Sequence, residues 1–151
     1  MADLRCSIDI AVPPGELFAF FIPQRMPLWY GFEMRARFQA ERGASEFSVG
    51  QKVRITGWLG GREVGLETTV TQCEWGRRFE WQIEDSCGVR GEQRWEFAPL
   101  PGGTRLTMSD SYRMPSFCAR VVDVAVTRFA VAARNRSWLG RLKRLASTAG
   151  C

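Results

Sequence analysis

The polar side chains best placed to do chemistry in this sequence stand at the end of an alternating apolar stretch. Asp110 and Tyr112 follow Leu106 and Met108 at two-residue steps, so in a strand all four share one face. An unpaired carboxylate on a buried face is costly, so Asp110 must be paired, hydrated or protonated. Asp110 is therefore a candidate for orienting a ligand or moving a proton. The alternatives are a strand end that turns it into solvent, or a purely structural hydrogen bond.

Three further side chains are candidates for such a site. Arg128 follows on a predicted helix and is a candidate partner for Asp110, while Tyr30 and Tyr112 carry hydroxyls that can donate to a ligand carbonyl. The alternative for both tyrosines is a hydroxyl satisfied by backbone or water at the edge of a core. Cys118 lacks an activating base, so we interpret it as a small buried residue rather than a nucleophile.

The absence of histidine excludes several kinds of site. With no histidine in the chain, histidine-based triads and histidine-dependent zinc sites cannot form. The sequence has no Gly-rich phosphate loop, so we expect neither a metal nor a nucleotide cofactor. The five cysteines are odd in number and lack C-x-x-C spacing, which favours reduced thiols. With no membrane-spanning run and no secretory pattern at residues 1–5, we expect a cytoplasmic location.

The net charge of +5 has a local source at the end of the chain. Five cations lie between residues 134 and 144, and the other 16 basic residues balance the 16 acidic ones. We therefore expect no nucleic-acid partner. Within residues 134–147 the cations alternate with Trp138, Leu139, Leu142 and Leu145, a pattern typical of weak contact with an anionic membrane surface. The alternative is that the cations complement the helix dipole and Trp138 packs on the first strands or short helices.

Hydrophobic alternation predicts seven strands and one long helix in a single domain of residues 1–151. The strands are expected near residues 4–10, 34–41, 52–59, 63–74, 78–84, 89–97 and 104–112. Two short helical segments are expected at 16–21 and 24–30, between the first two strands. The last six strands are joined by short connections and should form an antiparallel meander.

The long helix is expected from Pro115 to about Ala146, covering the apolar face of the sheet. Its first half carries an apolar stripe made of Cys118, Val121, Val122, Ala125, Phe129 and Ala132. Arg134 falls on the opposite, polar stripe. The apolar pattern rotates after Ala133, so we expect the first half to be buried on the sheet and the second half to enter another environment.

The order of these elements resembles the START-like helix-grip superfamily, and most closely its polyketide cyclase/dehydrase and lipid-transport branch. Residues 12–21, Val-Pro-Pro-Gly-Glu-Leu-Phe-Ala-Phe-Phe, are similar to the family's strand end followed by a helix that starts at proline. Trp29 stands where the family often has a tryptophan, and residues 95–106 resemble its penultimate hairpin. The resemblance covers nearly the whole chain. It implies a helix-grip α+β fold, in which a curved seven-stranded antiparallel sheet wraps around the C-terminal helix.

The resemblance also implies a cavity between sheet and helix that holds an apolar small molecule such as a lipid or polyketide. The side chains expected to line it are Tyr30, Phe38, Ile55, Thr68, Trp81, Gln93, Trp95, Met108, Asp110, Tyr112, Val121, Ala125 and Arg128. One alternative is a cyclase or aromatase that uses Asp110 and Tyr112, with Arg128 assisting. A further alternative is a protein-interaction module whose cavity has collapsed.

Overall fold

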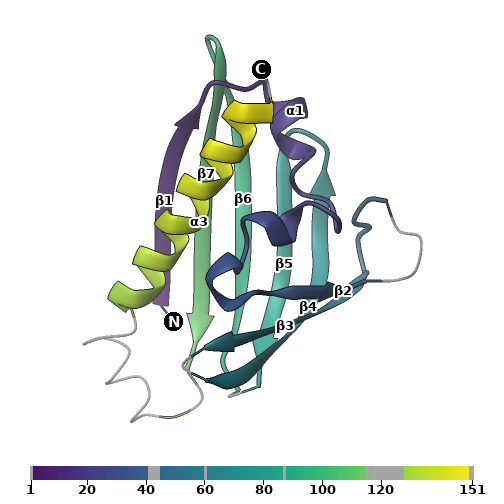
Figure 1. The fold of residues 1–151 in the computed structure, drawn as a ribbon, viewed down its shortest axis with the longest axis vertical. Coiled ribbons are helices and arrows are strands. Elements are labelled where there is room, and N and C mark those ends of the chain that lie inside the picture. The colour runs from purple at the N-terminus through teal and green to yellow at the C-terminus, as the bar shows by residue number, and fades with distance from the viewer. Residues whose placement is uncertain are drawn as a thin grey trace.

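A seven-stranded antiparallel sheet curves around one long helix to form the frame of the molecule (Figure 1). The computed structural model describes residues 2–40, 45–59, 61–86, 88–114, 116 and 128–149. The strands are β1 (Ala2–Ile10), β2 (Arg37–Gln39), β3 (Lys52–Leu59), β4 (Arg62–Glu74), β5 (Arg78–Asp85), β6 (Arg90–Leu100) and β7 (Gly103–Arg113). Their order in the sheet is β1-β7-β6-β5-β4-β3-β2. The predicted helix-grip α+β fold and its meander are confirmed.

The hairpins of the meander fix which side chains face inward. In β6 and β7, Gln93 pairs with Asp110, Trp95 with Met108, and Phe97 with Leu106. Partners in a register share one face of the sheet, so these six side chains form adjacent columns. The β6–β7 turn contains Gly102 at φ 79°, a left-handed conformation that favours glycine.

Three short helices follow β1, where two were predicted, and their bounds also differ from the prediction. They are α1 (Pro14–Phe18), η1 (Met26–Leu28) and η2 (Phe32–Met34). Pro14 opens α1 because its fixed φ suits a first helical turn. The predicted strand at 34–41 shrinks to β2, because Met34 ends η2 and Arg35 has a left-handed φ of 52°.

The helix α3 (Arg128–Ala149) lies along β1 and crosses the open side of the sheet (Figure 1). Its buried side chains are Asn135, Trp138, Leu139, Leu142 and Ala146. Phe129 is 75% exposed, so its predicted burial is wrong. Helical rotation of about 100° per residue places Phe129 roughly opposite Trp138. The other predicted stripe members up to residue 125 lie outside the described residues.

The part of the helix after Ala133, which we expected to enter another environment, carries the buried side chains of α3. Trp138 Nε1 donates to Glu33 Oε2 at 2.7 Å, and Arg141 Nε donates to the Leu28 carbonyl at 2.7 Å. The tail therefore packs on the short helices, which confirms the alternative given for Trp138 in the sequence analysis. No helix in the described part of the chain is long and apolar enough to cross a membrane.

Aromatic rings fill the space between the sheet, the short helices and α3. Trp29, Tyr30, Trp81, Trp95 and Trp138 are all fully buried. The centroid of the Tyr30 ring lies 4.2 Å from that of Trp138 and 5.3 Å from that of Trp81, so the three rings pack against one another. This aromatic core leaves only limited room for a ligand.

Candidate functional site

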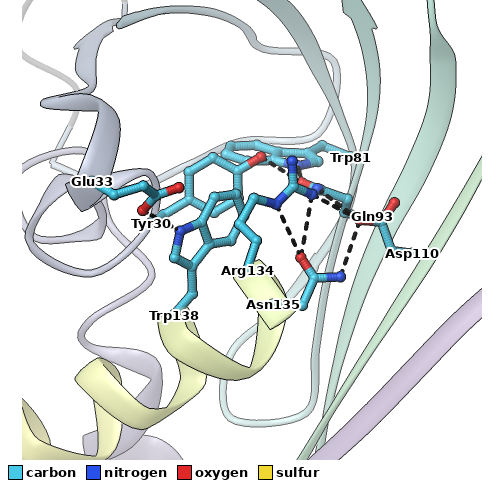
Figure 2. A network of polar contacts seen from close by, with 8 residues as sticks. All are labelled: Tyr30, Glu33, Trp81, Gln93, Asp110, Arg134, Asn135 and Trp138. Atoms are coloured by element: carbon cyan, nitrogen blue, oxygen red, sulfur yellow. Dashed lines mark hydrogen bonds and ion pairs between the residues drawn. The ribbon is translucent and has the colours of Figure 1, made fainter. Parts of the chain in front are cut away.

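Gln93 lies at the centre of a buried polar network on the inner face of the sheet (Figure 2). Its Oε1 accepts a hydrogen bond from the Tyr30 hydroxyl at 2.6 Å and another from Trp81 Nε1 at 2.9 Å. Its Nε2 donates to Asp110 Oδ2 at 3.4 Å. Burial raises the pKa of Tyr30, so its hydroxyl stays protonated and remains a donor.

Asp110 receives its other hydrogen bonds from the helix. Arg134 Nη2 donates to Asp110 Oδ2 at 3.1 Å, and Asn135 Nδ2 donates to the same oxygen at 3.2 Å. Burial raises the pKa of Asp110 above its ordinary value, although the Arg134 charge and the hydrogen bonds from Asn135, Gln93 and Arg134 act in the opposite direction. Asp110 is 2% exposed, so the predicted inward carboxyl is confirmed.

Arg134 is a cation that pairs with Asp110. The predicted partner was Arg128, whose side chain is not among those that the structure describes. Arg134 also donates to Asn135 Oδ1 and stacks over the Trp138 ring, with its guanidinium carbon 4.4 Å from the ring centroid. Arg134 was placed on the stripe opposite the one that faces the sheet, and this placement is wrong because its side chain reaches Asp110 in β7. The available signal was the rotation of the apolar pattern after Ala133, which puts Asn135 on the same face as Trp138 and Leu142.

A cavity of about 140 Å³ adjoins this network. Its apolar walls are Leu66, Ile83, Val89, Met114 and Val131, and its polar lining is Tyr30, Asp85, Gln93, Asp110, Tyr112 and Arg134. Typical ligand pockets measure roughly 300–1,000 Å³, but an apolar cavity of about 150 Å³ can hold benzene. The cavity is therefore large enough for one ring-sized group.

The other predicted site residues either lie in the surrounding core or are not among the residues that the structure describes. Ile55, Trp95 and Met108 are fully buried, and Phe38 is half-buried against the Tyr30 and Trp81 rings. The Thr68 hydroxyl donates to the Val53 carbonyl at 2.8 Å, which gives it a structural partner. Val121 and Ala125 lie outside the described residues.

Two wider hollows, of about 720 and 480 Å³, involve the outer side of the sheet. Charged side chains such as Lys52, Glu84, Arg90 and Arg113 line the larger one. Lining of this kind is expected of a solvated sheet face. An apolar ligand would gain little there, so the smaller interior cavity is the better candidate site.

The fold and the buried network define the class of this protein: it is a helix-grip domain with a small, partly open cavity between the sheet and α3. The sequence matches the model of one family, polyketide cyclase/dehydrase and lipid transport, over residues 1–147. The chain belongs to that family, as its resemblance implied. A comparison with curated proteins finds no significant match.

Solved structures of similar fold have low sequence identity. DynU16, from the dynemicin biosynthetic locus, has a TM-score of 0.72 and 19% identity, with 97% of this chain and 48% of DynU16 covered. This chain therefore spans about half of DynU16. TTHA0849 from Thermus thermophilus has a TM-score of 0.74 and 15% identity, with 99% and 100% covered. CV1439 from Chromobacterium violaceum has a TM-score of 0.71 and 16% identity, with 97% and 98% covered. At these identities the similarity shows the fold alone.

Proposed function

We propose that this protein binds an apolar small molecule in the cavity between the sheet and α3, with the ligand's polar end at the Asp110 network. The observation that carries the proposal is the lining of the 140 Å³ cavity, where apolar walls face a few convergent polar groups. This combination is typical of ligand sites. Membership of a family that includes lipid-transport proteins supports the same function.

The binding function can be tested by native mass spectrometry of protein purified from its own host, combined with thermal shifts across apolar and aromatic ligands. Val131→Phe should fill the cavity, because Val131 is a half-buried wall residue, and should abolish a ligand-induced shift. Ser137→Phe adds the same side chain on the exposed side of α3 and should keep the shift. No copurified ligand, together with no shift in the native protein, would contradict binding.

A second candidate function is acid–base catalysis of the cyclase kind. The observation that favours it is that Asp110, with its raised pKa, lines the cavity together with Tyr112. An enzyme of this kind would lose turnover in Asp110→Asn while retaining ligand binding. A pure carrier has no turnover to lose, so product formation from a bound polyketide separates the two functions.

The expected location and membrane contact remain predictions. Cys6 and Cys73 are free thiols, which supports a cytoplasmic location. Arg136, Lys143 and Arg144 are exposed on α3 and are the cations available to an anionic surface. Because Trp138, Leu139 and Leu142 are buried, any such contact would rest mainly on charge and would weaken with salt.

A further inference from the structure

The two oxygens of the Asp110 carboxylate have different surroundings. All three hydrogen bonds that Asp110 accepts, from Gln93, Arg134 and Asn135, end on Oδ2. No residue in the described ranges donates to Oδ1, which points away from those donors in Figure 2. Asp110 also lines the cavity beside the network. Among the described residues, Oδ1 is therefore the oxygen of this carboxylate that stays open to a ligand.

Both polar atoms of the Gln93 amide, and two of the three guanidinium nitrogens of Arg134, are already engaged. Gln93 Oε1 accepts from both Tyr30 and Trp81, and Gln93 Nε2 is used by Asp110. Arg134 directs Nε and Nη2 to Asn135 and Nη2 to Asp110. A ligand group that donates a hydrogen bond can therefore be added at Oδ1 without breaking any of these contacts.

The charges and the volume of the cavity limit the class of ligand further. Arg134 balances the charge of Asp110, so the cavity favours a neutral ligand over an anion that would face the carboxylate. The volume of about 140 Å³ accepts one ring, and the walls beside it, such as Ile83 and Val131, are apolar. The remaining requirement is a hydrogen-bond donor on an apolar ring.

We propose that the cavity selects a neutral ring-sized molecule that carries a hydroxyl group, and that this hydroxyl donates to Asp110 Oδ1. The ring then lies among the apolar wall residues. This inference rests on the proposed binding function and narrows its ligand class.

Four small probes test the inference by isothermal titration of the full chain: phenol, toluene, benzonitrile and benzoate. Phenol can donate a hydrogen bond, benzonitrile can only accept, toluene does neither, and benzoate is an anion. Phenol should bind about tenfold more tightly than toluene or benzonitrile, since a hydrogen bond to a buried charged group discriminates by that order. Benzoate should bind most weakly of the four.

Asp110→Asn changes the chemistry of the same position while preserving its shape. The amide oxygen can keep the three donors, and the amide NH₂ then replaces Oδ1. Phenol should lose its advantage and benzonitrile should gain affinity. Asp9→Asn is the matched control, because Asp9 is exposed on the outer face and paired with Arg105. It should leave the order of the four probes unchanged.

Equal affinity for phenol and toluene in the native protein would overturn the hydroxyl requirement, and so would a phenol preference that survives Asp110→Asn. Strongest binding of benzoate would make Arg134 the recognition group and would also overturn it. These results leave the proposed binding function standing. If none of the four probes binds while a longer apolar ligand does, the ring-sized class is wrong. Should Asp110→Asn fail to fold, the series with the native protein decides alone.

Discussion

Gln93 connects the two parts of the buried polar network at the scale of single residues. It accepts from Tyr30 and Trp81 on one side and donates to Asp110 on the other. A buried donor that loses its acceptor costs free energy, because water cannot replace the missing partner. The residue therefore serves stability and also keeps Tyr30 and Asp110 in fixed positions at the cavity.

Gln93→Leu tests this role by leaving the Tyr30 hydroxyl and Trp81 Nε1 without their acceptor. Each unsatisfied buried group costs about 1–3 kcal/mol, so the free energy of unfolding should fall by about 2–6 kcal/mol in total. Urea denaturation measures the change. Gln82→Leu, at an exposed position on the neighbouring strand β5, should alter it by less than about 0.5 kcal/mol. Similar values for the two variants would show that the network contributes little.

Asp110 predicts a particular dependence of stability on pH. Since burial raises its pKa in the folded state, the folded protein binds more protons than the unfolded one between the ordinary and the raised value. The stability contributed by Asp110 is fully present below its ordinary pKa and is lost as pH rises through the raised value. The native protein should therefore be most stable relative to Asp110→Asn at acidic pH, and this advantage should shrink as pH rises.

Urea denaturation of both proteins across acidic to neutral pH measures that difference. Asp9→Asn provides a control of opposite sign, because the hydrogen bond from Arg105 lowers the pKa of Asp9. The native protein should lose its advantage over this control as pH falls through the lowered pKa. A native advantage over Asp110→Asn that grows with rising pH would contradict a raised Asp110 pKa.

At the scale of elements, α3 is anchored by the part of the helix that follows Ala133. Trp138 is fully buried, packs at a tilt against the Tyr30 ring, and donates a hydrogen bond to Glu33 in η2. Arg134 and Asn135 precede it by one turn and reach Asp110 from the same face of the helix. The contacts that dock the helix are thus the contacts that complete the polar side of the cavity.

Trp138→Ala should lower the free energy of unfolding by about 3–5 kcal/mol, as expected for removal of a large buried aromatic side chain. Phe129→Ala removes an aromatic side chain from the exposed side of the same helix and should change stability by less than about 0.5 kcal/mol. Chemical denaturation distinguishes the two. A larger loss in Phe129→Ala would support the helix face predicted from the sequence.

The sequence predicted which side chains face inward on the strands better than it predicted which face of the long helix is buried. Period-two alternation identifies inward residues directly, so Gln93, Trp95 and Asp110 were placed correctly on the buried face. A helix needs a continuous apolar stripe, and around Ala133 the stripe is broken by small and charged residues. Arg134 was placed on the opposite, polar stripe by helical spacing, which gives no sign of a buried partner in β7.

At the scale of the whole molecule, the fold and family could be predicted because the order of elements is distinctive. The size of the cavity could not, because it depends on how the rings of Tyr30, Trp81 and Trp138 pack against one another. Alternation shows that a side chain points inward, but gives no measure of the space left around it. The polar network could also be predicted only in part, because Tyr30 and the network residues on the sheet were the members identified as candidate site residues.

The central prediction is that a ligand binds in the cavity beside Asp110. A crystal structure of the protein soaked with phenol tests it most directly. We predict electron density for the ring against Ile83 and Val131, with its oxygen within hydrogen-bond distance of Asp110 Oδ1. An empty interior cavity, with phenol bound only in the charged hollow on the outer side of the sheet, would contradict the claim.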